Sequence, residues 1–198
     1  GAAVNEKVPR FQLPGCTARG QGYIGFHLQK GIKRERRKEK MPWHVATVVT
    51  QMVVDQDDPA FADPTKPIGS FYTREEAEAM MAKDPSLCMK EDSNRGYRQM
   101  VPSPKPVTIA EKESILNLLD HEFIVIACGG GGIPVVVDEN GDFQSSPAVI
   151  DKDFASAKLA ELVDADYLFI LTAVARVAIR FGQPDQADLD ETAVEEAQ

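Results

Sequence analysis

The sequence has few cysteines, no long apolar run and less positive than negative charge. Its three cysteines, Cys16, Cys88 and Cys128, are odd in number and far apart, so we expect reduced thiols in a cytoplasmic compartment rather than a disulfide framework. No apolar stretch reaches the roughly 20 residues that cross a bilayer, and no signal-peptide pattern opens the sequence. The net charge of -9 and the pI of about 4.9 argue against nucleic acid or an anionic membrane as the main partner.

Several familiar ligand motifs are also missing. His27, His44 and His121 show no metal-ligand spacing, so no protein metal site is predicted. No segment matches the phosphate-binding pattern that ends in Gly-Lys-Ser/Thr or the dinucleotide pattern Gly-x-Gly-x-x-Gly. The 198 residues, 43% hydrophobic and 27% charged, are typical of one soluble globular domain with a substantial core.

Four consecutive glycines stand out in the second half of the chain. We call them the glycine loop: Gly129, Gly130, Gly131 and Gly132. They follow the apolar run 123–128, which is interpreted as a buried strand. Because glycine has no side chain, backbone N–H groups can approach a ligand closely and converge on an anion. A flexible connection is the alternative, but the position directly after a strand favours a ligand site.

An acid and a lysine stand where the next helix is predicted. Asp151 and Lys152 begin a helix expected over residues 152–163. They form either a cap with first-turn charges or a phosphate site, in which the lysine neutralises the anion and the acid orients the lysine or faces a metal through water. Cys128, beside the glycine loop, is interpreted as a small buried hydrophobe rather than a nucleophile.

Further cations lie in the first half of the chain. Lys66 stands between Pro64 and Pro67, which restrict its backbone as a positioned contact requires; an ordinary surface lysine is the alternative. Arg95 and Arg98 are candidate substrate contacts because two guanidinium groups can bind an anion, although a surface pair fits equally well.

Apolar and β-branched runs predict the strands. They are residues 45–54, interpreted as a central strand, and residues 123–128, 133–137, 167–172 and 177–181. Because strands and helices alternate through the second half, we expect an α/β fold with a largely parallel sheet and a ligand at the carboxyl ends of its strands. The glycine loop lies at such an end, and so do Thr172, Ala173 and Val174.

Periodicity predicts a helix from Gln21 that buries an apolar stripe, formed by Ile24, Leu28 and Ile32. Further helices are expected from Thr108 and near Thr192.

Local signals mark turns and an excursion from the main core. Thr73 and Glu76 form a capping box that begins a helix, and Asn140-Gly141 is a hairpin signal. The stretch 55–104 is dense in proline and charge, which predicts a small protruding subdomain.

Several strings of residues resemble the carbamate kinases. They are DDPAF at 57–61, PTKPIGSFYT at 64–73, RGYR at 95–98, VPSPKP at 101–106, ACGGGGIP at 127–134 and VIDKDFA at 149–155. The resemblance begins near residue 18, continues to the end and rests on highly specific motifs.

The resemblance implies the amino acid kinase fold, a three-layer α/β/α sandwich with a protruding subdomain, assembled as a homodimer. It implies reversible phosphoryl transfer between ATP and carbamate, with ADP and carbamoyl phosphate as the other pair and Mg²⁺ as cofactor. In arginine catabolism such a reaction typically makes ATP. It places Asp151 and Lys152 at the nucleotide phosphates and directs Lys66 toward carbamoyl phosphate. The glycine loop and residues 172–174 would line the nucleotide.

The sequence also departs from that family. The family's first strand with its Gly-Gly-Asn loop, its Gly-Asn-Gly-Pro-Gln loop and its C-terminal Gly-Ser-Met-Gly-Pro-Lys segment have no counterpart here. We therefore expect a single domain truncated at both ends that binds nucleotide poorly. A non-catalytic relative with a binding or assembly role stays an alternative. So does an amino acid kinase for another carboxylate, although the segment around Lys66 speaks against it.

Overall fold

The computed structural model describes residues 12–174 and 176–190. The chain divides into two compact units, Gly1–Leu168 and Phe169–Gln198, and each is described by itself. The helix expected near Thr192 lies outside the described residues. None of the helices in the described residues combines the length and the apolar character needed to cross a membrane.

A mixed sheet forms the centre of the first unit. Its strand order is β6-β2-β8-β9, in which β2 pairs in parallel with β8 and antiparallel with β6. A second parallel pair joins β1 to β7. The strands are β1 (His44–Thr47), β2 (Gln51–Val54), β6 (Pro106–Ile109), β7 (Phe123–Ile126), β8 (Ile133–Val137) and β9 (Phe143–Ser145).

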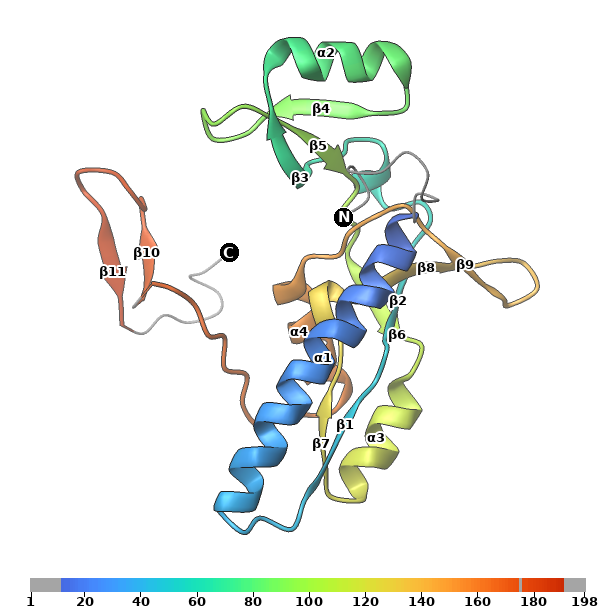
Figure 1. Ribbon diagram of the computed structural model, residues 1–198, viewed down its shortest axis with the longest axis vertical. Helices are drawn as coiled ribbons and strands as arrows, with labels where there is room; N and C mark the ends of the chain where they lie inside the picture. Colours follow the sequence, from blue (N-terminus) through green and yellow to red (C-terminus); the bar gives the residue numbers. More distant parts are fainter. Residues whose placement is uncertain (1–11, 175, 191–198) are drawn as a thin grey trace. The chain divides into compact units, whose positions relative to one another are not determined.

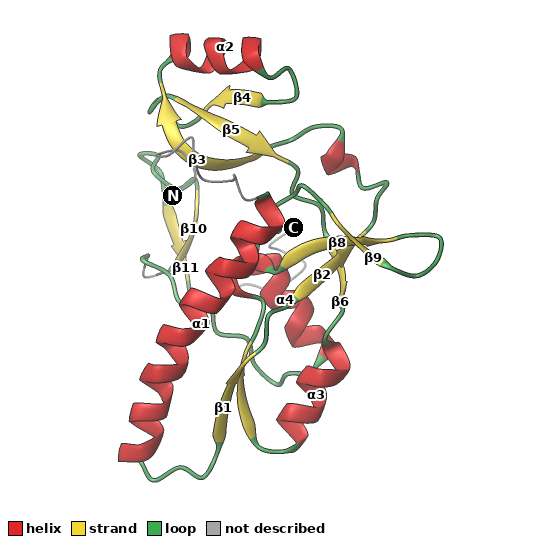
Figure 2. Cartoon of the chain, turned by 45° about the vertical axis from the view of Figure 1, so that its right-hand side comes forward, coloured by secondary structure: helices red, strands yellow, loops and turns green. Residues whose placement is uncertain are grey.

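Helices pack on these strands from two sides (Figures 1 and 2). The helices of this region are α1 (Leu13–Lys38), α3 (Lys112–Asp120) and α4 (Lys152–Leu162). Helix α1 contacts β1, β7 and β8, α3 contacts β7, and α4 contacts β6. This layering confirms the predicted α/β class.

The predicted central strand 45–54 is broken into β1 and β2. The two halves have different partners, since β1 pairs with β7 and β2 pairs with β6 and β8. At the break, the amide of Thr50 donates to the side chain of Gln21, and the carbonyl of Thr50 accepts from that side chain and from the amide of Ile133. The sequence run is apolar on both sides of the break, but the hydrogen-bond partners of its two halves differ.

Helix α1 begins earlier than predicted, and its buried side only partly coincides with the predicted apolar stripe. Pro14 is accommodated because a first-turn residue needs no N–H donor. The buried residues are Gln21 and Gly25, whereas Ile24 and Leu28 of the predicted stripe are 47% and 48% exposed. A Cβ on Gly25 would lie 2.2 Å from Cγ2 of Thr47, so glycine allows the helix to approach β1 on this face.

The other local predictions can be compared directly. The helix expected from Thr108 begins at Lys112, because the preceding residues form β6 and Ile109 pairs with Met52 of β2. The hairpin at Asn140 is confirmed by the antiparallel pair β8–β9. Strand β7 is half-buried, not fully buried as predicted, because β1 is its one pairing partner among the described residues.

A separate antiparallel sheet with the order β3-β5-β4 lies within the stretch 55–104, for which we propose a subdomain (green in Figure 1). Its elements are β3 (Lys66–Tyr72), α2 (Arg74–Lys83), β4 (Cys88–Glu91) and β5 (Tyr97–Val101). The capping box is confirmed, since Thr73 Oγ1 accepts from the amide of Glu76 at 3.2 Å and the Glu76 carboxylate accepts from the amide of Thr73 at 2.8 Å.

The core of the first unit adjoins the glycine loop and the start of α4. Its buried members are Met52, Val54, Ile109, Ile115, Cys128, Ile150 and Ala155. Cys128 directly precedes the glycine loop and Ile150 directly precedes Asp151. Both segments of the site are therefore anchored by buried neighbours.

The second unit contains a hairpin of β10 (Val177–Ile179) and β11 (Ala187–Leu189), which confirms most of the strand predicted over 177–181. The strand predicted over 167–172 is wrong, since these residues have no regular structure and Leu171 is 97% exposed. No strand of the described part of the chain pairs with them, and apolar character alone cannot supply the hydrogen bonds of a sheet.

Candidate functional site

The glycine loop has a backbone that only glycine adopts easily. Three consecutive residues, Gly130, Gly131 and Gly132, have φ values of 66°, 99° and 85°. A Cβ on Gly131 would lie 2.4 Å from the carbonyl oxygen of Ile150, and a Cβ on Gly132 would lie 3.2 Å from Cβ of Met52. The loop therefore packs its backbone directly against β2 and against the segment that leads into α4.

Two amides of this loop are open to a ligand. The amides of Gly131 and Gly132 donate to the carbonyls of Cys128 and Gly129 at 2.9 and 3.3 Å. The amides of Gly129 and Gly130 donate to no acceptor in the described residues, and Gly130 is exposed. Two neighbouring free N–H groups are the donors that a phosphate oxygen requires.

Lys66 and Asp151 meet beside this loop. Lys66, the first residue of β3, places Nζ 2.5 Å from Oδ2 of Asp151. Asp151 is the N-cap of α4, and its Oδ1 accepts from the amide of Asp153 at 2.9 Å. Both partners are half-buried. The structure thus joins two residues that the sequence singled out separately, at the start of a helix where an anion is favoured.

Asp58 fixes the segments that lead to and from the β3-β5-β4 sheet. Its carboxylate accepts from the amide of Ala60 at 2.8 Å and from the amide of Lys105 at 2.9 Å. These backbone hydrogen bonds hold the pKa of Asp58 below its usual value. Because Lys66 lies between the two tied segments in the chain, the carboxylate limits where the lysine can reach.

The ion pair makes the stability of the fold depend on pH. The hydrogen bond from Lys66, assisted by the amide of Asp153, lowers the pKa of Asp151 below its ordinary value. A depressed folded-state pKa means that the stabilisation is fully present above the unfolded-state pKa of about 3.9. It is lost as the pH falls through the folded-state value.

We therefore expect Asp151→Asn to lower the free energy of unfolding at pH 6 by about 0.5–1 kcal/mol, the range of a partly exposed pair. Asparagine keeps the helix cap, so the change isolates the charge. Urea unfolding measured from pH 6 to pH 3 should show the difference from the wild type shrinking below about pH 4. A difference that stays constant over this range would contradict the assignment.

The structure does not bring Lys152 onto the glycine loop. Its side chain is 74% exposed, and Nζ lies 3.6 Å from Oδ1 of Asp153. Thr172, Ala173 and Val174 belong to the second unit, so their placement against the loop is not described. The nucleotide roles of these residues stay predictions.

Arg95 and Arg98 cluster around one ring of the β3-β5-β4 sheet. Their guanidinium carbons lie 4.4 and 5.1 Å from the ring centroid of Phe71. Arg98 also bonds Oδ2 of Asp92 at 3.1 Å and the carbonyl of Gly69 at 3.2 Å. A substrate anion would have to compete with these local contacts, and the substrate role stays a prediction.

Cys128 is buried, which confirms that it packs as a small hydrophobe. Burial, together with the nearby Glu111 carboxylate, raises the pKa of its thiol to about 11. The thiol is therefore protonated at neutral pH and is not a nucleophile there.

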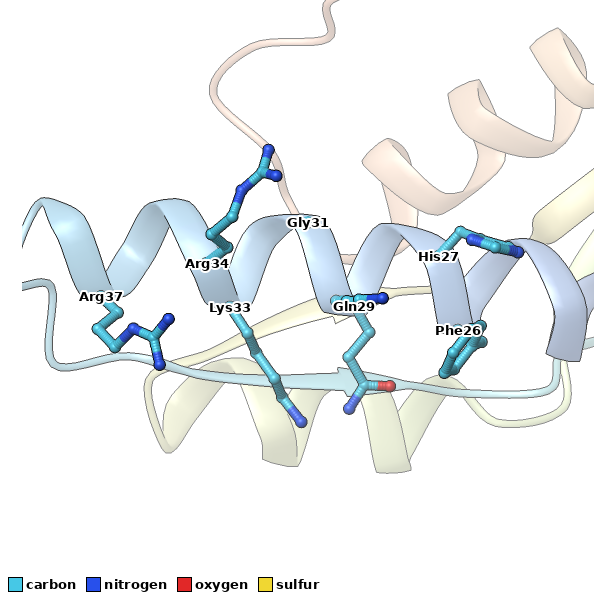
Figure 3. A pocket seen from close by; sticks show the side chains of 8 residues that line it. Phe26, His27, Gln29, Gly31, Lys33, Arg34 and Arg37 are labelled. Atoms are coloured by element: carbon cyan, nitrogen blue, oxygen red, sulfur yellow. The ribbon is translucent and has the colours of Figure 1, made fainter.

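A hollow of about 700 Å³ lies along α1 and is not lined by the glycine loop, Lys66 or Asp151. Its lining comes from one helix and includes Phe26, Lys33 and Arg34 (Figure 3). Figure 3 shows Lys33 and Arg34 pointing to opposite sides of the helix, so they do not converge on one ligand. The chemistry is better placed at the glycine loop, where free amides and an ion pair meet.

The sequence reasoning missed two polar residues behind the loop. Gln21 and Thr50 are buried and hydrogen-bonded to each other, and Thr50 also accepts from the amides of Cys128 and Ile133, which flank the loop. A glutamine with a glycine four residues later, on the same side of the helix as the apolar stripe, was the signal available for Gln21. No local signal distinguished Thr50 from the other β-branched residues of its run.

Comparison with known proteins decides the family. The sequence matches the amino acid kinase family over residues 15–198. The chain belongs to the amino acid kinase family. It is 57% identical over 189 residues to a carbamate kinase of Clostridium perfringens, covering 95% of this chain and 59% of that relative. It is 50% identical over 190 residues to the carbamate kinase-like protein YqeA of Escherichia coli, covering 96% and 60%.

A solved member of the family has the same fold. The carbamate kinase of Giardia lamblia bound to AMP-PNP is 41% identical, with a TM-score of 0.80, over 93% of this chain and 58% of that one. The resemblance to the carbamate kinases seen in the sequence motifs is thus confirmed. The chain spans about 60% of the length of the curated amino acid kinases it matches.

Proposed function

We propose that this protein is a carbamate kinase, which transfers a phosphoryl group reversibly between ATP and carbamate, with ADP and carbamoyl phosphate as the other pair. One observation carries the proposal: the contact between Lys66 and Asp151 beside a loop with two free amides. It occurs in a chain 57% identical to a carbamate kinase.

Phosphoryl transfer requires mainly that the protein position the substrates and neutralise the charge of the transferred group. A transferred phosphoryl group carries spread negative charge and needs no covalent intermediate with the protein. We assign the amides of Gly129 and Gly130 to phosphate oxygens of the nucleotide and the Lys66 ammonium to the phosphoryl group in transfer. Asp151 holds Lys66 in place before the anion arrives. Such donors are effective because they are fixed before the charge develops.

The donor set at the site fits a magnesium–nucleotide complex. Mg²⁺ bound with substrate phosphates needs only one or two protein carboxylates, and Asp151 is a carboxylate at the loop. No group of three acids, histidines or cysteines in the described residues forms a dedicated metal site. Bound Mg²⁺ would offset the negative charge of the phosphate oxygens.

The other predicted contacts belong to the same proposal. Lys152 and residues 172–174 are assigned to the nucleotide, and Arg95 and Arg98 to the carbamate side. A cytoplasmic homodimer that makes ATP from arginine-derived carbamoyl phosphate follows from the resemblance of the sequence motifs.

The protein as it occurs in the cell should form ATP when mixed with ADP, Mg²⁺ and carbamoyl phosphate, measured by luciferase against a reaction without protein. Acetyl phosphate in place of carbamoyl phosphate is the specificity control. ADP binding without ATP formation would favour a non-catalytic relative, and equal rates with both donors would contradict carbamate specificity.

A further inference from the structure

Thr50 connects to both ends of the glycine loop. It is 0% exposed and lies at the break between β1 and β2. Its Oγ1 accepts from the amide of Cys128 at 3.0 Å, and its carbonyl accepts from the amide of Ile133 at 2.9 Å. These two amides directly precede and directly follow the four glycines. One residue therefore holds the entry and the exit of the loop.

The entry is the strained end. Cys128 has φ 55° and ψ 27°, a left-handed conformation that is unfavourable for a residue with a side chain. The Thr50 hydroxyl stabilises it by accepting from the Cys128 amide and donating to the carbonyl of Val48 at 2.9 Å. Without the hydroxyl, a buried amide would lose its acceptor.

Gln21 of α1 holds Thr50 from the opposite side. Its Nε2 donates to the Thr50 carbonyl at 3.0 Å, and its Oε1 accepts from the Thr50 amide at 2.8 Å. The side chain is only 3% exposed, so both bonds form in a dry environment where an unpaired amide group is unfavourable. Cγ of Gln21 would also lie 3.2 Å from a Cβ on Gly129. The glutamine thus supports the residue that holds the loop and packs against the loop itself.

We propose that Thr50 and Gln21 are positioning residues for the phosphates of a nucleotide. By holding both ends of the glycine loop, they keep the amides of Gly129 and Gly130 directed outward and unpaired. Neither residue touches the ligand, and both act through the loop. The inference rests on the proposed function, because it assumes that a nucleotide phosphate is the anion bound there.

The test compares variants that remove one contact each. Thr50→Val keeps the shape and removes the hydroxyl, Thr50→Ser keeps the hydroxyl, and Gln21→Met keeps the length without the amide. Gln29→Met is the matched control, because Gln29 also lies on α1 and bonds β1, through the Val45 carbonyl at 3.1 Å and the Thr47 hydroxyl at 3.1 Å. It does not contact the loop.

We expect Thr50→Val and Gln21→Met to raise the Kd for ADP about tenfold, the equivalent of one lost hydrogen bond. Thr50→Ser should restore binding, and Gln29→Met should leave the Kd unchanged. Titration calorimetry with ADP gives the Kd, and urea unfolding identifies variants that fail to fold. Hydrogen exchange of the amides of residues 128–133, measured without ligand, should accelerate in Thr50→Val and Gln21→Met but not in the control.

The outcomes separate the two proposals. If the wild type binds ADP and the folded Thr50→Val variant binds equally well, the positioning role is wrong and the proposed function stands. If the wild type binds no ADP, both proposals fail together. If exchange in the loop is unchanged in Thr50→Val, the loop is not held by Thr50, whatever the affinity for ADP.

Discussion

Replacing Gly131 with alanine should abolish nucleotide binding and lower the free energy of unfolding by about 3 kcal/mol. The added Cβ would lie 2.4 Å from the Ile150 carbonyl oxygen and 3.0 Å from its carbon. Both atoms are backbone, so no rotamer change can relieve the contact. The φ of 99° is also unfavourable for alanine. Either the loop or the segment before Asp151 has to move, and both belong to the site.

Gly130→Ala is the matched control for this substitution. Gly130 has φ 66°, but a Cβ there meets nothing within 4 Å. Its substitution carries only the backbone penalty of about 1 kcal/mol. Urea unfolding and ADP titration of the two variants should therefore differ strongly. Equal losses in both would show that conformational strain, and not the contact with Ile150, limits the loop.

Lys66→Ala should lower the rate of ATP formation by about 10²–10³-fold, the effect of removing one preorganised donor to a developing charge. The ammonium lies 2.5 Å from Asp151 at the start of α4. Without it, the site keeps an acid that repels the phosphoryl group. The free energy of unfolding should change by less than about 1 kcal/mol, because the pair is only half-buried.

Lys90→Ala controls for the general loss of a lysine from the same sheet. Lys90 also forms an ion pair, with Asp63 at 2.9 Å, but that pair is more exposed. Steady-state kinetics with carbamoyl phosphate and ADP should show a normal rate for Lys90→Ala. Undiminished turnover in a folded Lys66→Ala variant would remove Lys66 from the mechanism, and loss of turnover in both variants would point to a general effect of charge.

Features specified by neighbouring residues were predictable from the sequence. The capping box of Thr73 and Glu76 and the start of α4 at Asp151 involve atoms only two or three residues apart. The run of four glycines likewise predicted a loop with little side-chain bulk, because glycine adopts positive φ without strain. The atoms that form these features lie within a few residues of one another, so no distant part of the chain is needed to form them.

Features that need a distant partner were not predictable in the same way. The run 45–54 contains nothing that marks a break, because the group that bonds Thr50 comes from Gln21, 29 residues earlier. Ile24 and Leu28 of the stripe predicted for α1 are exposed, because the close approach of Gly25 to Thr47 turns the adjoining side of the helix toward β1. Apolar periodicity records which residues are hydrophobic, not which neighbour is present.

The sequence alone determined the family motifs, the glycine loop after a strand and the chemical character of Lys66 and Asp151. Only the tertiary structure decided that these last two, 85 residues apart, meet at one helix start, whereas Lys152 faces solvent. It also decided that Thr50 holds both ends of the loop. The physical reason is that hydrogen bonds and ion pairs act over about 3 Å, so function at this site depends on distances that the fold sets and the order of residues does not record.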